Sequence, residues 1–287
     1  MTVTSLNNYS FAFNNFIFGG AGSPYQVTAV DGLASLPTLR VQDSDRGYID
    51  GMFSGRDFLS GRTITVTMLI LSGNGNSAQQ NLNLLQAALI PQQTGTTPLQ
   101  FQLSPATALQ RVNSRVRKRT VIIDPEFTYG YIKAQYEFFC PDPRWYDDAL
   151  QTAVTTVSTP LGRTYPRVYP LTYGGGSQTN TAAIYNGGWT NTYPVITING
   201  PIATPSIGNL TSGLSLNFNY TMTNLDTLVI DLDARTILLN GAPARNYVTG
   251  VSNWFNAAPG ANSFYFVGSG TTVGTTTATI TWRNAYI

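Results

Sequence analysis

Aspartates are the residues of this chain best suited to catalysis. Glycoside hydrolysis needs only two carboxyl groups, suitably spaced across a cleft. The candidates lie in or beside turns: Asp142, Asp147, Asp148, Asp226, Asp231 and Asp233. Because Asp is a common turn former, we favour the interpretation that Asp226 and Asp231 shape strand–turn–strand connections. A carboxylate-based glycosidase or depolymerase is the enzymatic alternative.

The chain lacks the residues that other common catalytic sites and metal sites require. The chain has no histidine and one cysteine, Cys140, which removes Ser-His-Asp and Cys-His catalysis and any zinc site rich in His or Cys. Asp43 and Asp45 resemble the start of a calcium loop, but the fifth position is Gly47 and the twelfth is Ser54, where a ligand is needed. We therefore expect no catalytic residue, no metal site and no cofactor.

A basic cluster stands out in residues 110–123, which are predicted to form a strand. On a strand, Arg115, Arg117 and Arg119 share one face, with Val116 opposite. This stripe is a candidate interface or channel lining that meets an acidic partner or passing DNA. The alternative is a solvated outer face or a charged edge strand.

Aromatic side chains indicate a second binding chemistry, because exposed aromatic rings on a β-sheet can stack on sugars while buried ones form core. Alternation with threonines places Trp282 on an apolar strand face, which predicts a core position. Trp254 lies in a turn-rich stretch and is a candidate glycan contact. A carbohydrate-binding adhesion protein is therefore an open alternative.

Composition predicts a chain that packs against neighbours. Of 287 residues, 42% are hydrophobic, enough for sizeable cores, and only 10% are charged, against about 25% in an average globular protein. A surface so low in charge has weak like-charge repulsion. No apolar run is long enough to span a membrane, and no signal peptide is visible, so we expect synthesis in a reducing cytoplasm and no membrane partner.

The first half of the chain predicts a mainly β domain over residues 1–150 with one helix. Aromatic residues with a rough period of two predict a strand over residues 7–18, and clean alternation predicts strands over 62–71 and 129–140. Leucines at helical spacing predict a helix over about 76–90, which Pro91 ends. Residues 37–60 between these elements are dense in turn formers.

The second half predicts a β-sandwich over residues 151–287. A shift to Thr, Val and Ser over residues 151–164 marks the domain boundary and suggests a linker. Beyond it, turn signals recur about every ten residues between short strands, which is typical of a sandwich. The strands are expected over residues 194–198, 214–222, 227–231, 236–239, 262–267 and 275–282. Asn240 and Gly241 predict a hairpin turn.

In pattern, the chain resembles the distal tail proteins of siphophages, the long-tailed bacteriophages. The N-terminal cues are the aromatic first strand, residues 61–67 (Gly-Arg-Thr-Ile-Thr-Val-Thr), the single helix, and the strand 136–140 that runs into Pro-Asp-Pro-Arg-Trp-Tyr at 141–146. The C-terminal half resembles the galectin-like β-sandwich of larger members through residues 192–200, 228–241, 254–262 and 280–283. The resemblance implies an N-terminal sandwich or barrel-like domain followed by that accessory sandwich.

The resemblance also implies a function without catalysis. Such proteins form a hexameric ring at the tip of the tail, with the N-terminal domains around a channel through which DNA exits. The outward sandwiches carry or contact receptor-binding proteins for host attachment, and the ring joins the tail tube to the hub or tape-measure end. We therefore expect a virion protein of the tail tip, made in the host cytoplasm. Galectin-type sugar sites typically use histidine, and its absence argues against lectin activity.

Overall fold

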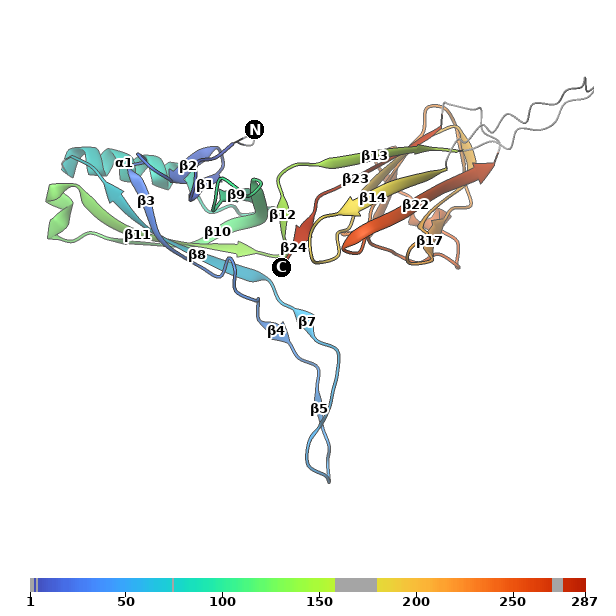
Figure 1. Cartoon of the computed structure of the whole chain (residues 1–287), viewed down its shortest axis with the longest axis horizontal. Helices are drawn as coiled ribbons and strands as arrows, with labels where there is room; N and C mark the ends of the chain where they lie inside the picture. Colours follow the sequence, from blue (N-terminus) through green and yellow to red (C-terminus); the bar gives the residue numbers. More distant parts are fainter. Residues whose placement is uncertain (1–2, 4, 74, 158–179, 270–275) are drawn as a thin grey trace, which may run out of the picture. The chain divides into compact units, whose positions relative to one another are not determined.

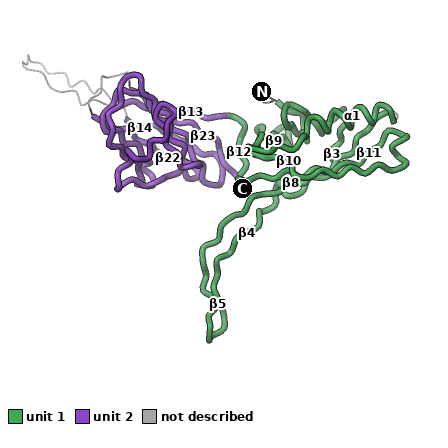
Figure 2. Tube along the Cα trace, turned by 180° about the vertical axis from the view of Figure 1, so that it is seen from behind, with its two compact units in different colours: residues 1–149, 287 green, residues 150–286 purple. Residues whose placement is uncertain are grey.

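Two compact units make up the protein. The computed structural model describes residues 3, 5–73, 75–157, 180–269 and 276–287. The first unit is Met1–Ala149 with Ile287, and the second is Leu150–Tyr286 (Figure 1, Figure 2). No helix in these described ranges is long and apolar enough to cross a membrane.

A curled antiparallel sheet forms the body of the first unit, as the prediction of a mainly β domain required. Its strands follow the order β2-β1-β9-β10-β11-β8-β3, and β12 pairs with β10. The end strands β2 and β3 lie side by side, so the sheet curls towards a barrel. The strands are β1 (Ser10–Phe13), β2 (Phe16–Gly19), β3 (Tyr25–Asp31), β8 (Arg62–Leu71), β9 (Thr97–Gln102), β10 (Gln110–Ile122), β11 (Tyr131–Cys140) and β12 (Trp145–Asp147).

The helix α1 (Gly75–Ala88) confirms the helix predicted over about 76–90, starting one residue earlier and ending two earlier. Its leucines Leu82 and Leu85 are buried, as is Leu89 directly after it. The helix packs against β8, β11 and the short 3-10 helix η1 (Pro125–Tyr129). Each leucine side chain buried in this way contributes about 1.5–3 kcal/mol to stability. The helix therefore adds its apolar stripe to the core inside the curled sheet.

The strand predicted over residues 7–18 is wrong, because the chain turns back within it. β1 and β2 form an antiparallel hairpin in which Phe13 pairs with Phe16. The two linking residues, Asn14 and Asn15, have φ values of 50° and 64°. Positive φ at both positions gives the turn whose twist matches the flanking strands, and Asn tolerates it. The aromatic period continues across this turn and conceals it in the sequence.

The second unit is a two-sheet sandwich, as predicted. One sheet has the order β13-β23-β15-β19-β20-β21, and the other β14-β22-β16-β17 with β18 beside β16. Isoleucines and phenylalanines from both sheets fill one core. The strands are β13 (Gln151–Thr156), β14 (Thr181–Asn186), β15 (Val195–Asn199), β16 (Ile202–Asn209), β17 (Leu214–Asn217), β18 (Thr221–Met222), β19 (Thr227–Asp231), β20 (Thr236–Leu239), β21 (Ala242–Pro243), β22 (Gly260–Ser269), β23 (Thr277–Trp282) and β24 (Ala285–Tyr286); η2 (Arg245–Tyr247) is a 3-10 turn.

Three expectations for this unit need correction. The stretch read as a linker begins with the strand β13, which pairs with β23; residues 158–164 lie outside the described residues. The single strand predicted over 214–222 is two strands, β17 and β18, that pair with different parts of β16. The strand β16 itself was not predicted, because Pro201, Pro205 and Gly208 are residue types that indicate turns and are rare inside strands. The hairpin turn at Asn240 and Gly241 is confirmed, with φ values of 51° and 83°.

The turn between β1 and β2 can be tested by substitution. Asn15→Val should destabilise the first unit by about 1–2 kcal/mol, since a β-branched residue is strained at positive φ. Asn15→Gly is the matched control and should leave stability unchanged or raise it. Denaturant titration, followed by hydrogen exchange of β1 and β2 to separate the two units, measures both. Equal stability of the two variants would contradict the turn geometry.

Candidate assembly surfaces

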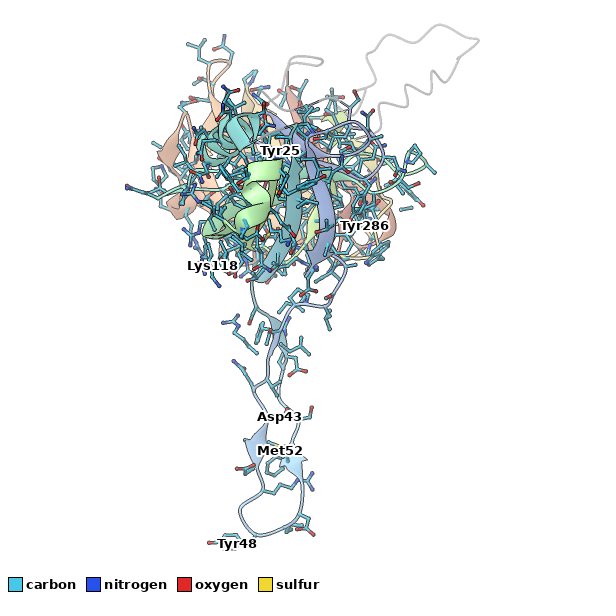
Figure 3. All side chains as sticks on the ribbon, turned by 90° about the vertical axis from the view of Figure 1, so that its left-hand side faces the viewer. Tyr25, Asp43, Tyr48, Met52, Lys118 and Tyr286 are labelled. Carbon is cyan, nitrogen blue, oxygen red and sulfur yellow. The ribbon has the colours of Figure 1, made fainter. Side chains whose placement is uncertain are left out.

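A long hairpin projects from the first unit between β3 and β8 (Figure 1, Figure 3). We call residues 36–60 the arm and residues 32–35 its root. The arm contains the short strands β4 (Leu39–Arg40), β5 (Ser44–Asp45), β6 (Met52–Phe53) and β7 (Phe58–Leu59). Its large apolar side chains have exposed fractions from 37% to 104%: Leu36, Leu39, Val41, Tyr48, Ile49, Met52, Phe53 and Phe58. Such a surface marks a site of interaction.

Few internal contacts hold the arm together. β4 pairs with β7 over two residues, and β5 pairs with β6 over two residues. Between them, the Asp43 carboxylate accepts a hydrogen bond of 2.8 Å from the backbone N–H of Gly55. A lone two-stranded hairpin is marginally stable in water. The arm therefore gains stability if another surface covers it.

One buried guanidinium fixes the root of the arm. Arg62, the first residue of β8, is only 2% exposed. Its Nη1 donates to the carbonyl oxygens of Gly32 and Ser35 at 2.8 Å each, and also to that of Leu33. Burial lowers the pKa of this guanidinium. Four carbonyl oxygens, counting that of Pro143 below, accept from its Nε and Nη1, whereas its Nη2 is buried without a hydrogen-bond partner. Gly32 is required here, since its φ is +78° and a Cβ would lie 2.0 Å from the carbonyl oxygen of Thr63.

The same guanidinium binds the segment that follows β11. Arg62 Nε donates to the carbonyl oxygen of Pro143 at 2.9 Å, and its Cζ lies 4.9 Å from the ring centre of Trp145. Asp142 shapes this segment by accepting hydrogen bonds from the N–H of Arg144 and from Arg144 Nε, at 3.2 and 2.8 Å. Two of the segments that carry the family resemblance, 61–67 and 141–146, therefore meet at the root of the arm.

The predicted stripe of three arginines on one strand face is wrong. In β10, Val116 pairs with Phe138 but Lys118 pairs with Glu137, so Arg117 is the extra residue of a β-bulge. The bulge shifts the alternation by one residue. Arg115 stays on the outer face opposite Phe139, whereas Arg119 pairs with Tyr136, whose side chain is buried. A single sequence cannot reveal such an insertion.

The outer face of this sheet is nevertheless basic. Arg115 and Arg117 both lie over the ring of Phe139, with Cζ atoms 5.7 and 3.4 Å from its centre. Lys118 forms an ion pair of 3.1 Å with Glu137, which at this exposure contributes under about 1 kcal/mol. Whether Arg115, Arg117 and Arg119 serve as an interface or channel lining stays a prediction.

The aspartates expected to be turn formers have that role. Asp226 accepts hydrogen bonds from the N–H and hydroxyl of Thr223 and from the Asn240 amide, and these bonds lower its pKa. Asp231 accepts bonds from the backbone N–H groups of Asp233 and Ala234. Asp43 and Asp45 belong to the arm. In the described part of the chain, no three His, Cys, Asp or Glu side chains gather into a potential metal site.

Among the aromatic residues, Trp282 is buried, as predicted, and its Nε1 donates to the carbonyl oxygen of Tyr185 at 3.0 Å. Trp254 is half-buried and packs against the sandwich core, which leaves part of its ring for any glycan. Its role as a glycan contact stays a prediction. Trp189, 62% exposed with its ring edge-on to Tyr286, is a more accessible aromatic that the sequence did not distinguish.

Sequence reasoning missed the arm and the role of Arg62. The signal available was a run of apolar residues within 36–58 that follow neither a helical nor a strand period, amid Gly and Asp. That combination is typical of a long projecting loop or hairpin whose side chains do not pack into a core of their own. The arm-root function of Arg62 depends on tertiary contacts with residues distant in sequence, so no local pattern predicts it.

Comparison with known proteins gives one family and a shared fold. Residues 187–286 match the family described as siphovirus-type tail component, C-terminal domain. No curated protein sequence matches the chain. The crystal structure of the SPP1 Dit protein, described as a paradigm of the hub adsorption apparatus in phages that infect Gram-positive bacteria, is similar in fold. It is 16% identical with a TM-score of 0.66, over 97% of this chain and 99% of that chain.

A chain of the phage P2 baseplate in its activated conformation with Ca is also similar. It is 10% identical with a TM-score of 0.50, over 96% of this chain and 98% of that chain. The likeness to the SPP1 protein spans both units, so the mainly β, two-part fold is common to the two chains. The resemblance seen in the sequence is confirmed by the family match in the second unit and by the fold over the chain.

The arm root provides a test of this geometry. Arg62→Met should lower the unfolding free energy of the first unit by at least about 2 kcal/mol, since each buried carbonyl left without a donor costs about 1–3 kcal/mol. Arg62→Lys should not restore it, because an ammonium lacks the planar fork. Arg235→Lys, at an exposed turn, is the control. Hydrogen exchange should rise in residues 32–38; full rescue by Lys would contradict the account.

Proposed function

We propose that this chain, which is a siphophage tail component with the distal tail protein fold, forms a hexameric ring at the tip of the tail. It is a structural protein of the virion and not an enzyme, since its family is one of tail components. The observation that carries ring formation is the exposed apolar arm, residues 36–60. An exposed apolar surface of this kind is typical of a site that a partner covers.

The asymmetry of the arm supports a ring. The arm leaves one side of the first unit, so an arm that docks on a neighbour contacts a different surface from the one that it left. Repeated contacts between unlike surfaces give closed rings when the rotation between copies closes. A charged content of only 10% keeps repulsion between identical neighbours small. Both features support an assembly subunit.

We also propose a separate role for each half of the chain. Residues 1–150 build the ring around a channel for DNA, and residues 151–287 carry or contact receptor-binding proteins. The ring joins the tail tube to the hub or tape-measure end. Similar folds occur in proteins described as parts of a hub adsorption apparatus and of a baseplate, which supports the position at the tail tip. Sugar binding at Trp254 gains no specific support, because this side chain is half-buried against the core.

The arm tip tests ring formation. We expect the purified protein to sediment as an assembly of six chains of 31.1 kDa. The double variant Tyr48→Ser, Phe53→Ser should reduce this mass to that of one chain at the same concentration, because it removes two large apolar contacts. Both side chains are exposed, so the isolated subunit should keep its fold and its circular dichroism spectrum.

A matched control removes an equally exposed aromatic side chain outside the arm. Tyr185→Ser, at a position 66% exposed in the second unit, should leave the assembly intact. A wild-type protein that remains a single chain at micromolar concentration would overturn the proposal. Retention of the full assembly by the double arm variant would show that other surfaces hold the ring.

A further inference from the structure

One outward sheet face of the second unit carries tyrosine rings among hydroxyl and amide side chains. It belongs to β14, β22, β16 and β17, which pair in that order (Figure 1). Phe264 and Phe266 of β22 point into the core, so Tyr265 between them points outward and is half-buried. Tyr185, near the end of β14, points to the same side and is 66% exposed. We call this side of the sheet the tyrosine face.

A glycine makes room for the central ring of this face. Gly208 of β16 pairs with Tyr265 on one side and with Ser215 of β17 on the other. A Cβ on Gly208 would lie 2.7 Å from Tyr265 Cε1 and 2.7 Å from Ser215 Cβ. The ring of Tyr265 therefore reaches across the sheet over Gly208 and lies beside the serine side chain. A ring that lies along a sheet in this way can offer one of its faces to a ligand.

Polar groups beside the ring are held in fixed positions. Ser206 Oγ donates a hydrogen bond of 2.6 Å to Asn217 Oδ1, and Asn217 Nδ2 donates one of 3.2 Å to Ser215 Oγ. An amide nitrogen carries two hydrogens, and a hydroxyl both donates and accepts, so these bonds leave further capacity on Asn217 and Ser215. The tyrosine face thus places oriented donors and acceptors next to an aromatic ring.

The ionic character of this sheet is as informative as its polar groups. The five described strands β14, β16, β17, β18 and β22 contain no Asp, Glu, Lys or Arg. An ionised ligand would lose hydration on this face without meeting an opposite charge. A neutral ligand rich in hydroxyl groups has no such cost. The face therefore favours an uncharged ligand that has both apolar and hydrogen-bonding surface.

The other sheet of the sandwich provides an internal comparison. The outward positions of its strands β15, β19 and β23 hold threonine, valine and asparagine, together with Asp231. No aromatic residue lies on the outward side of these three described strands, since Trp282 of β23 is buried. Low charge is therefore common to both sheets, whereas an aromatic ring beside fixed polar groups distinguishes the tyrosine face.

We infer that the tyrosine face binds a neutral polysaccharide chain built of pyranose rings. The C–H groups on one side of a pyranose pack on the ring of Tyr265, and the sugar hydroxyls form hydrogen bonds with Asn217 and Ser215. Such a site needs no histidine and is distinct from the contact predicted at Trp254. The inference goes beyond the proposed function, because it gives the sandwich a ligand of its own whether or not the ring forms. An assembly of several copies would hold one long chain more tightly than a single copy does.

Affinity electrophoresis of the full chain tests this site, with dextran, laminarin and galactomannan as neutral probes and poly(glycerol phosphate) as the charged probe. We expect at least one neutral polymer to retard the protein and the charged polymer to leave it unretarded. Tyr265→Ala should weaken the binding by roughly tenfold or more, whereas Tyr265→Phe, which keeps the ring, should retain most of it. Asn217→Asp, which has nearly the same shape, should also weaken the binding, because it replaces an amide donor with a charge.

The matched control is Trp189→Ala, which removes a 62% exposed aromatic side chain of the same unit that lies on no strand of the tyrosine face; it should bind like the wild type. Thermal unfolding of each variant shows whether the sandwich stays folded. Binding that survives both Tyr265→Ala and Asn217→Asp, or that is lost in Trp189→Ala, would overturn the inference.

An absence of binding to the three neutral polymers and to an array of neutral glycans would overturn it as well. Sedimentation of the same samples separates this inference from the proposed function. Assemblies of full mass that bind no neutral glycan would overturn only the ligand of the tyrosine face. Single chains that bind a neutral polymer through Tyr265 would count against the ring and leave the site standing.

Discussion

The buried guanidinium of Arg62 is the interaction on which the arrangement of the first unit depends. Removing a charge from water costs far more than a hydrogen bond returns unless its donors are satisfied. Here the carbonyl oxygens of Gly32, Leu33, Ser35 and Pro143 accept from Nε and Nη1, and the ring of Trp145 lies beside the guanidinium, while Nη2 stays buried without a hydrogen-bond partner. These contacts join the chain entering the arm to the segment after β11, so the direction of the arm is fixed by the core.

The root and the arm contribute differently to how the arm meets another surface. The root sets where the arm leaves the sheet, and the few backbone pairs along the arm let it adapt to the surface that it meets. An extended arm places apolar side chains far from the body, so a small subunit can reach its neighbour without enlarging its own core. The low charge of the chain and the match of residues 187–286 to a family of tail components agree with a protein that works as part of an assembly.

Regular periodicity made much of the fold predictable. β8 was predicted with its observed bounds because Ile64, Val66, Met68 and Ile70 alternate with threonine and leucine, and the leucine spacing of α1 located the helix. Prediction failed where one residue changes the register or the direction of the chain. The bulge at Arg117, the turn at Asn14 and Asn15, and the proline-containing β16 are such places.

The assembly surfaces were less predictable for a different reason. A strand or helix that faces its own core repeats its apolar residues with the period of the element. In the proposed assembly the arm faces another molecule and has no core of its own, and Leu39, Tyr48 and Phe53 follow no such period. The hypothesis of a function without catalysis was easier to reach from the sequence, because a chain without histidine lacks the side chains of the commonest mechanisms.

Electron cryo-microscopy of the purified, assembled protein tests the central claim most directly. We expect a closed six-fold ring in which density for residues 36–60 of each copy lies against the neighbouring copy. A ring whose arms extend freely into solvent, with the copies held by other surfaces, would contradict the account of the arm. A population of single chains would contradict ring formation itself.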